Sequence, residues 1–426
     1  MMRAIILCGG KGSRISDLAQ GKPKNLLELK DKSILQYQLD CLEACDFDEV
    51  YLIAGFGIDA MNEFVNNYQG KLQINLVLDT DLTGTGNALK FCKNYIDDET
   101  FLIMGDLLID FDFKKMLKEN SDSKSLVVCH THPSNHIFDS DSVNIDSENF
   151  ISKINFKGQE TNITNNLTLS GIFLLSKEFI NLPNLIFNGD FTKNILNSLL
   201  VEGLRVKSYK SADFVKDVGT LDRFGWAEKI INFKKFGGHH NKRAAIFLDR
   251  DGTINESNGY IKTFDDLTIF PGNAEGISKL NELGYLLFVT TNQPILARGE
   301  IDSQDLNQIH NLLEIELAKD NAFIDEIHYC PHHPDSGFEG EKLDLKIDCE
   351  CRKPRTGMVD KLTEKYSIDL NNSWVVGDSW RDEKLAENLN INYSKITMQH
   401  TNIEKLEFKN ILDFANYLEL KNAYTN

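Results

Sequence analysis

The sequence lacks a long apolar run and an excess of basic residues. The longest apolar run near the N-terminus is residues 4–8, which is too short for the core of a signal peptide or for a membrane span. The 426 residues contain 46 Lys and Arg against 64 Asp and Glu, so the net charge is −18. Broad binding to nucleic acid or to an anionic membrane needs a basic surface, so neither is an expected partner. Small phosphorylated substrates remain compatible, because a few local cations can hold them.

Cysteine is also sparse. Eight cysteines in a chain of this length do not form a disulfide framework. Five of them are scattered over the first 129 residues, whereas Cys330, Cys349 and Cys351 lie close together beside a histidine. This distribution predicts a protein of the reducing cytoplasm with one metal site.

Short β-like runs alternate with helix-like segments along the whole chain, which is typical of α/β domains with mainly parallel sheets. Buried strands are expected in two series, one at residues 4–8, 50–53, 74–78 and 101–104 and one at residues 244–248, 286–289 and 374–376. Residues 233–243 contain paired glycines, a basic bias and no apolar period, so they are expected to form a linker. We therefore predict two Rossmann-like α/β domains, residues 1–232 and residues 244–426.

A glycine-rich turn follows the first expected strand, at residues 7–14, Leu-Cys-Gly-Gly-Lys-Gly-Ser-Arg. Glycines let backbone N–H groups approach phosphate oxygens closely. The turn is neither a Walker A loop nor the full dinucleotide fingerprint, and alone it is equally compatible with an ordinary turn. Lys24, next to Pro23, supplies a point charge that suits a phosphate.

Two carboxylates and a second Gly/Thr loop add to this pattern. Asp106 comes just after the expected strand at residues 101–104, and Asp217 begins an Asp-Val-Gly-Thr sequence. Ligands of open α/β sheets bind at the carboxyl ends of strands, and Mg²⁺ prefers oxygen ligands. The Gly/Thr loop is residues 82–87. Each aspartate taken alone would be interpreted as a turn or helix cap, so the combination is what indicates a site.

Residues 2–230 resemble the sugar-1-phosphate nucleotidyltransferases. The motifs that carry the resemblance are Gly-Gly-x-Gly-x-Arg in the first loop, Pro-Lys-x-Leu at 23–26, Gly-Asp at 105–106 and Asp-x-Gly-Thr at 217–220. The resemblance implies a glycosyltransferase-A-like sheet. It also implies a reaction in which a sugar 1-phosphate oxygen attacks the α-phosphorus of a nucleoside triphosphate and releases pyrophosphate, mainly through positioning and charge neutralisation.

The same resemblance implies a role for each matching residue. The triphosphate would be held by Gly10, Gly12 and Arg14, and Lys24 would neutralise charge near the reacting phosphates. The Mg²⁺ ligands would be Asp106 and Asp217, the base or sugar would lie near Gly86, and the sugar would contact the strand that contains Gly171.

Other segments bear on the sugar and the base. Residues 132–141 resemble a subgroup associated with manno-heptose 1-phosphate, and residues 170–173 resemble a sugar-contacting strand of the family. The chain departs from the family pattern at Ile15, where Leu or Met is usual, and at Leu221, where Pro often follows. The Glu-Lys-Pro motif of some hexose relatives is missing. These departures leave the reaction unchanged and the sugar and base open.

The second half opens with two carboxylates, Asp249 and Asp251, one residue apart at the end of an apolar strand. One carboxylate can attack phosphorus, and the other can protonate the leaving alcohol and then activate water. The sequence of the motif is Asp-Arg-Asp-Gly-Thr. Three further motifs follow in the order that such a site needs: Thr-Thr-Asn-Gln at 290–293, Arg-Lys-Pro at 352–354 and Gly-Asp at 377–378.

These four motifs resemble the haloacid-dehalogenase-like phosphatases over residues 244–400. The resemblance implies that Asp249 is the nucleophile and Asp251 the acid/base. It implies that Thr291 and Lys353 bind the phosphoryl group. The Mg²⁺ ligands would be Asp249, the backbone carbonyl of Asp251, and Asp378, with Asp382 as a supporting carboxylate. Ser379 stands where lysine is usual.

The clustered cysteines form a Cys-x-His and a Cys-x-Cys pair: Cys330, His332, Cys349 and Cys351. Three thiolates and one imidazole make a closed tetrahedral Zn²⁺ site, which favours a structural role. The neighbouring His333 is not an expected ligand, and residues 333–348 form an insertion between the two pairs. The zinc would place Arg352 and Lys353 beside the active site.

The zinc clip with Asp-Arg-Asp-Gly, Asn292 and the Ala-Arg-Gly sequence around Arg298 resembles both the heptose bisphosphate and the histidinol-phosphate phosphatases. Asn292, Arg298 and Arg352 would contact the substrate. The fusion of the two domains favours a heptose bisphosphate phosphatase. The product of that phosphatase, heptose 1-phosphate, is a sugar 1-phosphate of the kind that a nucleotidyltransferase uses. Mg²⁺ in both domains and Zn²⁺ in the second are the expected cofactors.

The resulting hypothesis is a bifunctional enzyme that removes the 7-phosphate of D-glycero-D-manno-heptose 1,7-bisphosphate through an aspartyl-phosphate and transfers GMP from GTP to heptose 1-phosphate. GTP follows from the resemblance to α-anomer heptose pathways. One alternative is a histidinol-phosphate-type phosphatase fused to a transferase that uses another sugar 1-phosphate or triphosphate. Another is a first domain that only senses sugar nucleotides. A homo-oligomer is compatible with the sequence, and the heptose anomer and direct transfer between sites stay open.

Overall fold

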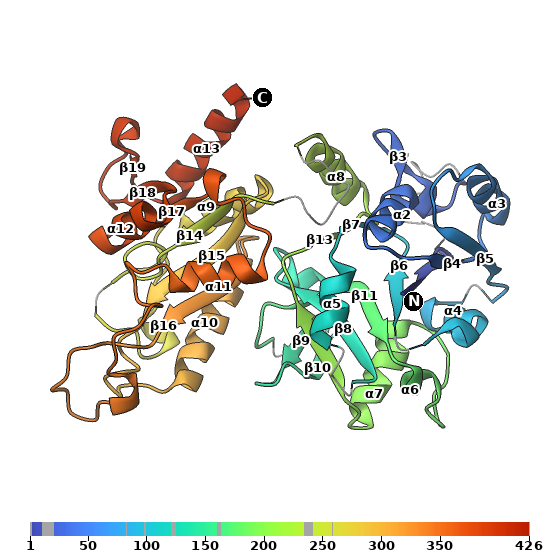
Figure 1. The fold of residues 1–426 in the computed structure, drawn as a ribbon, viewed down its shortest axis with the longest axis horizontal. Helices are drawn as coiled ribbons and strands as arrows, with labels where there is room; N and C mark the ends of the chain where they lie inside the picture. Colours follow the sequence, from blue (N-terminus) through green and yellow to red (C-terminus); the bar gives the residue numbers. More distant parts are fainter. Residues whose placement is uncertain are drawn as a thin grey trace. The chain divides into compact units, whose positions relative to one another are not determined.

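The computed structural model describes residues 2–10, 21–81, 83–97, 99–120, 125–159, 163–233, 242–257 and 259–425 (Figure 1). Three residues singled out in the sequence, Gly12, Arg14 and Ile15, lie outside this described part, as does most of the expected linker. The chain divides into two compact units: Met1–His132, Asp141–Thr161 and Thr168–Asn241 form the first, and Pro133–Ser140, Asn162–Leu167 and Lys242–Asn426 form the second. No helix in the described part of the chain combines the length and apolar composition that a membrane span needs.

The first unit is built on a nine-stranded sheet in which β10, β9, β11, β6, β1, β4 and β5 follow one another, with β8 between β11 and β12. The strands of this unit are β1 (Arg3–Leu7), β2 (Glu28–Leu29), β3 (Lys32–Ser33), β4 (Glu49–Ala54), β5 (Gln73–Leu78), β6 (Thr100–Met104), β7 (Leu107–Asp110), β8 (Val127–His132), β9 (Ser142–Ile145), β10 (Ile151–Asn155), β11 (Thr168–Leu175), β12 (Val206–Lys210) and β13 (Phe214–Asp217). β1 pairs in parallel with β4 and β6, and β4 with β5. These are the four strands expected from the sequence.

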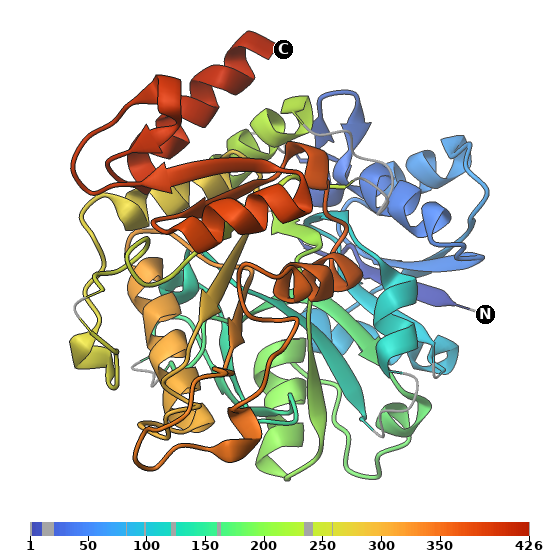
Figure 2. The ribbon, with the colours of Figure 1, turned by 60° about the vertical axis from the view of Figure 1, so that its left-hand side comes forward.

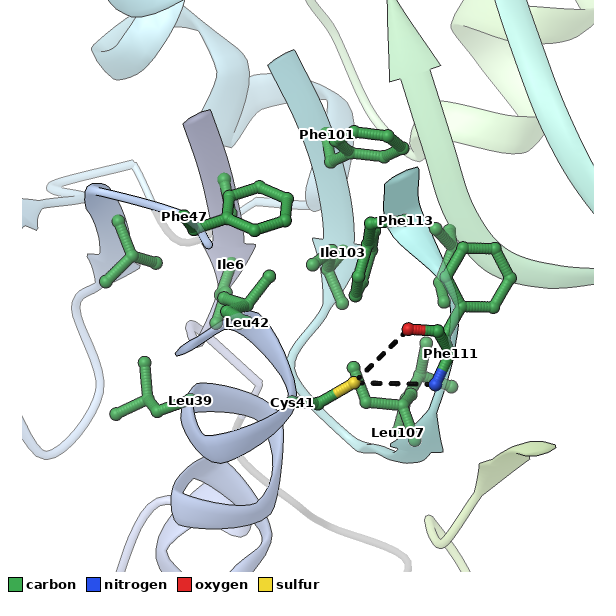
Figure 3. Packing of buried hydrophobic residues seen from close by; sticks show 14 of the residues in the cluster. Ile6, Leu39, Cys41, Leu42, Phe47, Phe101, Ile103, Leu107, Phe111 and Phe113 are labelled. Atoms are coloured by element: carbon green, nitrogen blue, oxygen red, sulfur yellow. Dashed lines mark hydrogen bonds between the residues drawn. The ribbon is translucent and has the colours of Figure 1, made fainter. Parts of the chain in front are cut away.

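The helices of the first unit are α2 (Ile34–Ala44), α3 (Ile58–Asn67), α4 (Thr85–Cys92), α5 (Phe113–Asn120), α6 (Lys177–Ile180), α7 (Asn197–Val201) and α8 (Leu221–Phe233). One face of α2 packs Leu39, Cys41 and Leu42 against the sheet and the aromatic side chains beside it (Figure 3). Phe101 and Phe113 meet edge-on with ring centroids 5.0 Å apart. Burial of large apolar side chains against a parallel sheet is the main stabilising term of such a layer.

The second unit is a six-stranded parallel sheet in the order β16-β15-β14-β17-β18-β19. Its strands are β14 (Ala245–Leu248), β15 (Leu286–Asn292), β16 (Glu326–Cys330), β17 (Trp374–Gly377), β18 (Asn392–Ile396) and β19 (Glu407–Phe408). Its helices are α9 (Asn273–Glu282), α10 (Ser303–Ala318), α11 (Gly357–Lys365), α12 (Trp380–Leu389) and α13 (Ile411–Thr425), which can be followed from a second direction in Figure 2.

Alternation along β14 distributes its side chains over two faces. Ile246 and Leu248 belong to one core cluster with residues of α9, α10 and α13, whereas Phe247 points to the other face and stacks on Phe288. Both faces of the sheet are therefore covered, as a parallel sheet requires. The prediction of two α/β folds is confirmed.

Candidate active sites

The carboxyl ends of β14 and β17 bring the carboxylates of the second unit together. The two strands are parallel neighbours, and Asp249 and Asp378 each follow the last residue of one of them. The backbone N–H of Asp249 donates to the carbonyl of Val376 at 2.9 Å, which fixes the register of the two strand ends. Carboxylate oxygens of Asp249, Asp378 and Asp382 all lie within 4.8 Å of one another. Three hard oxygen ligands at this spacing could hold a divalent cation.

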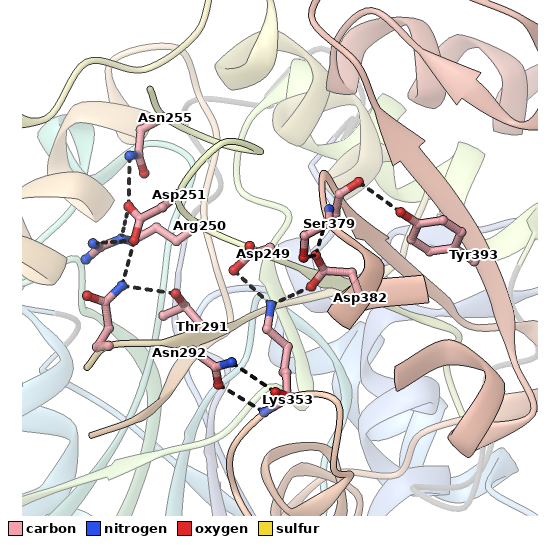
Figure 4. Close-up of polar contacts among 12 residues, drawn as sticks. Asp249, Arg250, Asp251, Asn255, Thr291, Asn292, Lys353, Ser379, Asp382 and Tyr393 are labelled. Carbon is pink, nitrogen blue, oxygen red and sulfur yellow. Dashed lines mark hydrogen bonds and ion pairs between the residues drawn. The ribbon is translucent and has the colours of Figure 1, made fainter. Parts of the chain in front are cut away.

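Lys353 lies at the centre of this cluster (Figure 4). Its Nζ atom is 2.8 Å from Oδ1 of Asp249 and 2.6 Å from Oδ1 of Asp382, and the side chain is buried. The amide of Asn292 holds the Lys353 backbone from both sides: Nδ2 donates to the carbonyl at 3.1 Å, and the N–H donates to Oδ1 at 3.0 Å. Asn292 was expected to contact substrate, but in this structure both ends of its amide position Lys353.

Burial and charge shift the titration of this cluster. Burial raises the pKa of Asp249, the ammonium of Lys353 opposes this effect, and Asp382 adds to it. Burial and the charge of Asp382 also raise the pKa of Asp378. Burial would lower the pKa of Lys353, but Asp249 and Asp382 outweigh it and raise the pKa. One lysine among three acidic groups leaves excess negative charge, which fits a site for Mg²⁺.

Asp251 points away from this carboxylate cluster into a set of donors. Arg250 gives it two hydrogen bonds of 2.9 Å, Asn255 one of 3.0 Å and Gln293 one of 2.8 Å. Burial, the largest single influence, would raise the pKa of Asp251, but Arg250 and the two amides together lower it. Arg250 is 1 % exposed, and its Nη1 also donates to Nε2 of His310 at 3.1 Å. Sequence reasoning gave Arg250, Asn255, Gln293 and His310 no such role.

Thr291, expected to bind the phosphoryl group, is the last residue but one of β15 and accepts a hydrogen bond of 3.0 Å from Gln293. Gly252 directly follows Asp251 and has φ +85°. A Cβ there would lie 2.3 Å from Oδ2 of Asp378, which follows β17. Only glycine therefore lets the turn after Asp251 pass so close to this carboxylate.

The expected zinc ligands converge at the end of β16. The Sγ atom of Cys351 lies 3.2 Å from that of Cys330 and 3.3 Å from that of Cys349, and Nδ1 of His332 lies 3.2 Å from the Cys351 sulfur. All four donor atoms lie within 4.8 Å of one another, so the cluster could hold a metal ion. Arg352, which follows the last ligand, donates to the carbonyl of His332 at 3.1 Å.

In the first unit, Lys24, Asp106 and Asp217 converge in the same way. The ammonium of Lys24 donates to Asp106 and lies 4.0 Å from Asp217. Asp217 reaches this position because β13 pairs antiparallel with β7, which begins directly after Asp106. The carbonyl of Asp106 also accepts from the N–H of Val218 at 3.0 Å. Two carboxylates and one lysine at one sheet edge could position phosphates with a cation.

Two residues that sequence reasoning missed, and the glycine of the Asp-x-Gly-Thr motif, support this cluster. The guanidinium of Arg223 donates to Asp217, and the buried amide of Gln38 donates to the carbonyls of Met104 and Leu107 at 2.9 and 3.0 Å. A Cβ at Gly219 would lie 2.2 Å from Nζ of Lys24, so this glycine admits the lysine. Arg223 follows Asp217 by six residues on α8, and Gln38 lies on α2, and the motifs alone gave neither of them a role.

The remaining expected glycines have different surroundings. Gly171 has φ +93°, and a Cβ there would meet Met104 at 2.9 Å, next to the Gly-Asp turn. The N–H of Gly86 donates to the carbonyl of Gly189 at 2.8 Å, which docks the Gly/Thr loop on the 188–190 turn. A Cβ at Gly10 would meet nothing within 4 Å.

Two family models match separate parts of the chain. Residues 3–232 match the nucleotidyl transferase family, and residues 350–407 match the HAD-hydrolase-like family. A stretch of 142 residues, 33 % of this chain, is 39 % identical to 73 % of the D-glycero-beta-D-manno-heptose-1,7-bisphosphate 7-phosphatase of Photorhabdus laumondii. The enzyme of the same name from Rhodopseudomonas palustris is also 39 % identical, over 34 % of this chain and 79 % of its own length.

Solved structures also match parts of the chain. The structure of HddC from Yersinia pseudotuberculosis covers 55 % of this chain and 100 % of its own, with 21 % identity and a TM-score of 0.47. The D,D-heptose 1,7-bisphosphate phosphatase from B. bronchiseptica, complexed with magnesium and phosphate, covers 42 % of this chain and 99 % of its own, with 29 % identity and a TM-score of 0.36.

Proposed function

The chain belongs to the nucleotidyl transferase family over residues 3–232 and, through a further 142-residue stretch, to the D-glycero-beta-D-manno-heptose-1,7-bisphosphate 7-phosphatases, and we propose that it catalyses two consecutive steps of nucleotide-activated heptose synthesis. The second unit hydrolyses the 7-phosphate of D-glycero-D-manno-heptose 1,7-bisphosphate. The first unit transfers GMP from GTP to the resulting heptose 1-phosphate. The observation that carries the proposal is that one chain joins these two families, because the product of the phosphatase is the class of substrate the transferase takes.

In the phosphatase step, a carboxylate oxygen of Asp249 attacks phosphorus, and the bond from phosphorus to the C7 oxygen breaks. Asp251 donates a proton to that oxygen, and then takes a proton from the water that attacks the aspartyl-phosphate and releases inorganic phosphate. Lys353, 2.8 Å from Asp249, favours the ionised form of the nucleophile and contacts the transferred group together with Thr291. Mg²⁺ held by Asp249, Asp378 and the Asp251 carbonyl would neutralise phosphoryl charge.

In the transferase step, an oxygen of heptose 1-phosphate attacks the α-phosphorus of GTP, and the bond to the pyrophosphate oxygen breaks. Lys24 lies where it can balance the charge of the reacting phosphates, and Gly10, Gly12 and Arg14 would hold the triphosphate. Mg²⁺ held by Asp106 and Asp217 would shield the same charge. The heptose follows from the partner domain, and the choice of GTP rests on the resemblance of the arrangement to α-anomer heptose pathways.

Zn²⁺ is proposed for the Cys330, His332, Cys349 and Cys351 cluster. The donor set is the three-thiolate, one-imidazole set of closed structural zinc sites, with no position left open for substrate. Cys351 precedes Lys353 by two residues, so the metal fastens the loop that delivers the lysine. Its role is therefore to hold the active site in shape.

The test uses purified full-length protein, Mg²⁺, heptose 1,7-bisphosphate in each anomeric form and each nucleoside triphosphate in turn. We expect inorganic phosphate first and pyrophosphate with GTP second. Asp249→Asn should stop both products from the bisphosphate, but still release pyrophosphate when heptose 1-phosphate is supplied. Asp106→Asn should stop only pyrophosphate. Release of pyrophosphate with another triphosphate instead of GTP would show that the assigned base is wrong. Faster turnover of histidinol phosphate than of the bisphosphate would show that the assigned phosphatase substrate is wrong. No pyrophosphate with any triphosphate would favour a first domain that only senses sugar nucleotides.

A further inference from the structure

His130 is a fully buried histidine of the first unit, and both of its ring nitrogens meet serine hydroxyls. It lies on β8, which runs antiparallel to β11 (Figure 1). Its Nδ1 is 2.8 Å from Oγ of Ser170 on β11, and its Nε2 is 3.0 Å from Oγ of Ser211, the residue after β12. Burial lowers the pKa of His130 well below its usual value, and the neighbouring His132 lowers it further. The ring is therefore neutral at pH 7, with one donor nitrogen and one acceptor nitrogen.

The direction of this chain of hydrogen bonds is set at its Ser211 end. The Ser211 hydroxyl donates to Oδ2 of Asp213 at 2.9 Å, and its oxygen accepts from the N–H of Asp213 at 3.2 Å. A hydroxyl has one proton and a carboxylate only accepts, so the proton between Ser211 and His130 belongs to Nε2. Nδ1 is then the acceptor, and the Ser170 hydroxyl donates to it. His130 therefore determines where the Ser170 hydroxyl points.

The Ser170 end of the chain lies in a bulge of β11. The pairing of β11 with β8 shifts between residues 169 and 173, so residues 170–172 lie opposite His130 alone. Inside this bulge the Ser170 oxygen accepts from the N–H of Ile172 at 3.2 Å. Because the same hydroxyl donates to His130, Ser170 closes the bulge and ties it to β8. Bulges redirect the chain, and they are common next to active sites.

The bulge places Gly171 beside the turn that carries Asp106. Gly171 has φ +93°, and a Cβ there would lie 2.9 Å from Cγ of Met104, two residues before Asp106. Glycine at this position therefore leaves no side chain between β11 and the turn. Asp106 forms an ion pair with Lys24, the lysine that is proposed to balance the charge of the reacting phosphates. A sugar whose 1-phosphate reacts there is carried next to this turn, and Gly171 leaves room for it.

We propose that His130 is a positioning residue for the sugar 1-phosphate of the transferase reaction, because it holds the bulge of β11, through Ser170, in the shape that receives the sugar. His130 itself is buried and acts only through Ser170. The inference rests on the proposed transferase function, and it adds the part of the first unit that sets the affinity for the sugar.

The test measures pyrophosphate release by the full-length protein with Mg²⁺ and determines KM for heptose 1-phosphate and KM for GTP separately. Ser170→Ala removes the hydroxyl inside the bulge, whereas Ser211→Ala removes the support on the far side of the His130 ring. We expect both variants to raise KM for heptose 1-phosphate at least about fivefold and to leave KM for GTP within about twofold of the wild type. Partial unfolding alone would reduce the amount of active enzyme and change neither KM.

Ser208→Ala is the matched control. Ser208 is also a buried serine, and its Oγ is 2.7 Å from Oγ1 of Thr131. Thr131 follows His130 on β8, so its side chain points to the opposite face of the sheet. The control therefore removes the same chemical group at a similar depth but away from the bulge. Both KM values of Ser208→Ala should equal those of the wild type.

Ser211→Ala decides the question, because Ser211 can reach the bulge only through His130. If the wild type releases pyrophosphate and Ser211→Ala keeps the wild-type KM for heptose 1-phosphate, the role of His130 is overturned and the proposed function stands. An equal rise of this KM in Ser208→Ala would overturn that role as well. A wild-type protein that releases no pyrophosphate from heptose 1-phosphate with any triphosphate would overturn both the role and the proposed function.

Discussion

Lys353 Nζ lies 2.8 Å from Oδ1 of Asp249, the carboxylate that the sequence marks as the nucleophile. Asp249 follows the last residue of β14, whereas Lys353 lies on the loop that leaves the cysteine cluster. The Asn292 amide fixes the lysine backbone, so the distance is set by three separate segments. Several changes to this arrangement have defined consequences.

Replacing Lys353 with Met should remove the phosphatase activity and destabilise the second unit. The change leaves Asp249 and Asp382 buried without their ammonium, and breaking such a buried pair costs about 3–5 kcal/mol. Phosphate release from the bisphosphate should fall at least about 100-fold. The second unit should also unfold at a lower temperature than in the wild type. Lys384→Met is the control, since Lys384 is an exposed partner of Glu387 on α12. Equal effects of the two variants would contradict the central role of Lys353.

Gly219→Ala should lower transferase activity with little loss of stability. The new Cβ would lie 2.2 Å from Nζ of Lys24, the far end of a flexible side chain that can move at small cost but then leaves Asp106. Pyrophosphate release should fall at least about tenfold, with a change in unfolding free energy below about 1 kcal/mol. Gly225→Ala, on α8 with nothing within 4 Å, should keep full activity and stabilise the helix by about 1 kcal/mol.

Removing the metal from the cysteine cluster should stop the phosphatase and spare the transferase. Cys349→Ser, or a strong chelator, takes away one of four donors, and the loop that carries Arg352 and Lys353 loses its anchor. Metal analysis of the purified protein should show one Zn²⁺ lost per chain in Cys349→Ser. His333→Ala should retain the zinc and the phosphatase activity. Loss of zinc in His333→Ala would show that the ligand set is wrong.

Glu326→Gln should destabilise the protein at pH 7 but not at low pH. Burial would raise the pKa of Glu326, but His328, Lys365 and Tyr366 outweigh it and lower the pKa well below its usual value. A carboxyl with a lowered pKa in the folded state stabilises above its unfolded pKa of about 4.3, and this contribution disappears as the pH falls below that value. The unfolding free energy of the wild type should exceed that of Glu326→Gln by about 1–3 kcal/mol at pH 7.

The difference should shrink steadily below pH 4, measured as the unfolding free energy of both proteins from pH 7 to pH 3. A difference that stays constant across this range would mean that Glu326 acts through shape and not through its charge.

Much of both sites could be predicted because the motif residues follow strands directly. An apolar run that ends in Asp249 or in Gly377 and Asp378 places the carboxylate at a sheet edge, whatever the rest of the fold does. The grouping of the cysteine cluster could be predicted for a similar reason. The two ligands of each pair are neighbours in the sequence, so all four donors come together once the two loops meet.

The supporting residues could not be predicted, because their roles depend on tertiary packing. Arg250 stands between Asp249 and Asp251 in the sequence, yet its direction, toward His310, depends on the packing of α10. Arg223 and Gln38 reach their sites only once α8 and α2 have packed. Asn292 was assigned to substrate from the resemblance to the two phosphatase groups, and only the fold shows that the backbone of Lys353 occupies both ends of its amide.

The pairing of β13 with β7 sets an order of events during protein synthesis. β1, β4, β5 and β6 leave the ribosome early and can form a sheet with α2, since domains begin to fold from the N-terminal side. Lys24 and Asp106 can meet at that stage, but Asp217 is still inside the ribosome or not yet made. A nascent chain that ends before β13 therefore lacks Asp217, and we expect such a fragment to be inactive as a transferase.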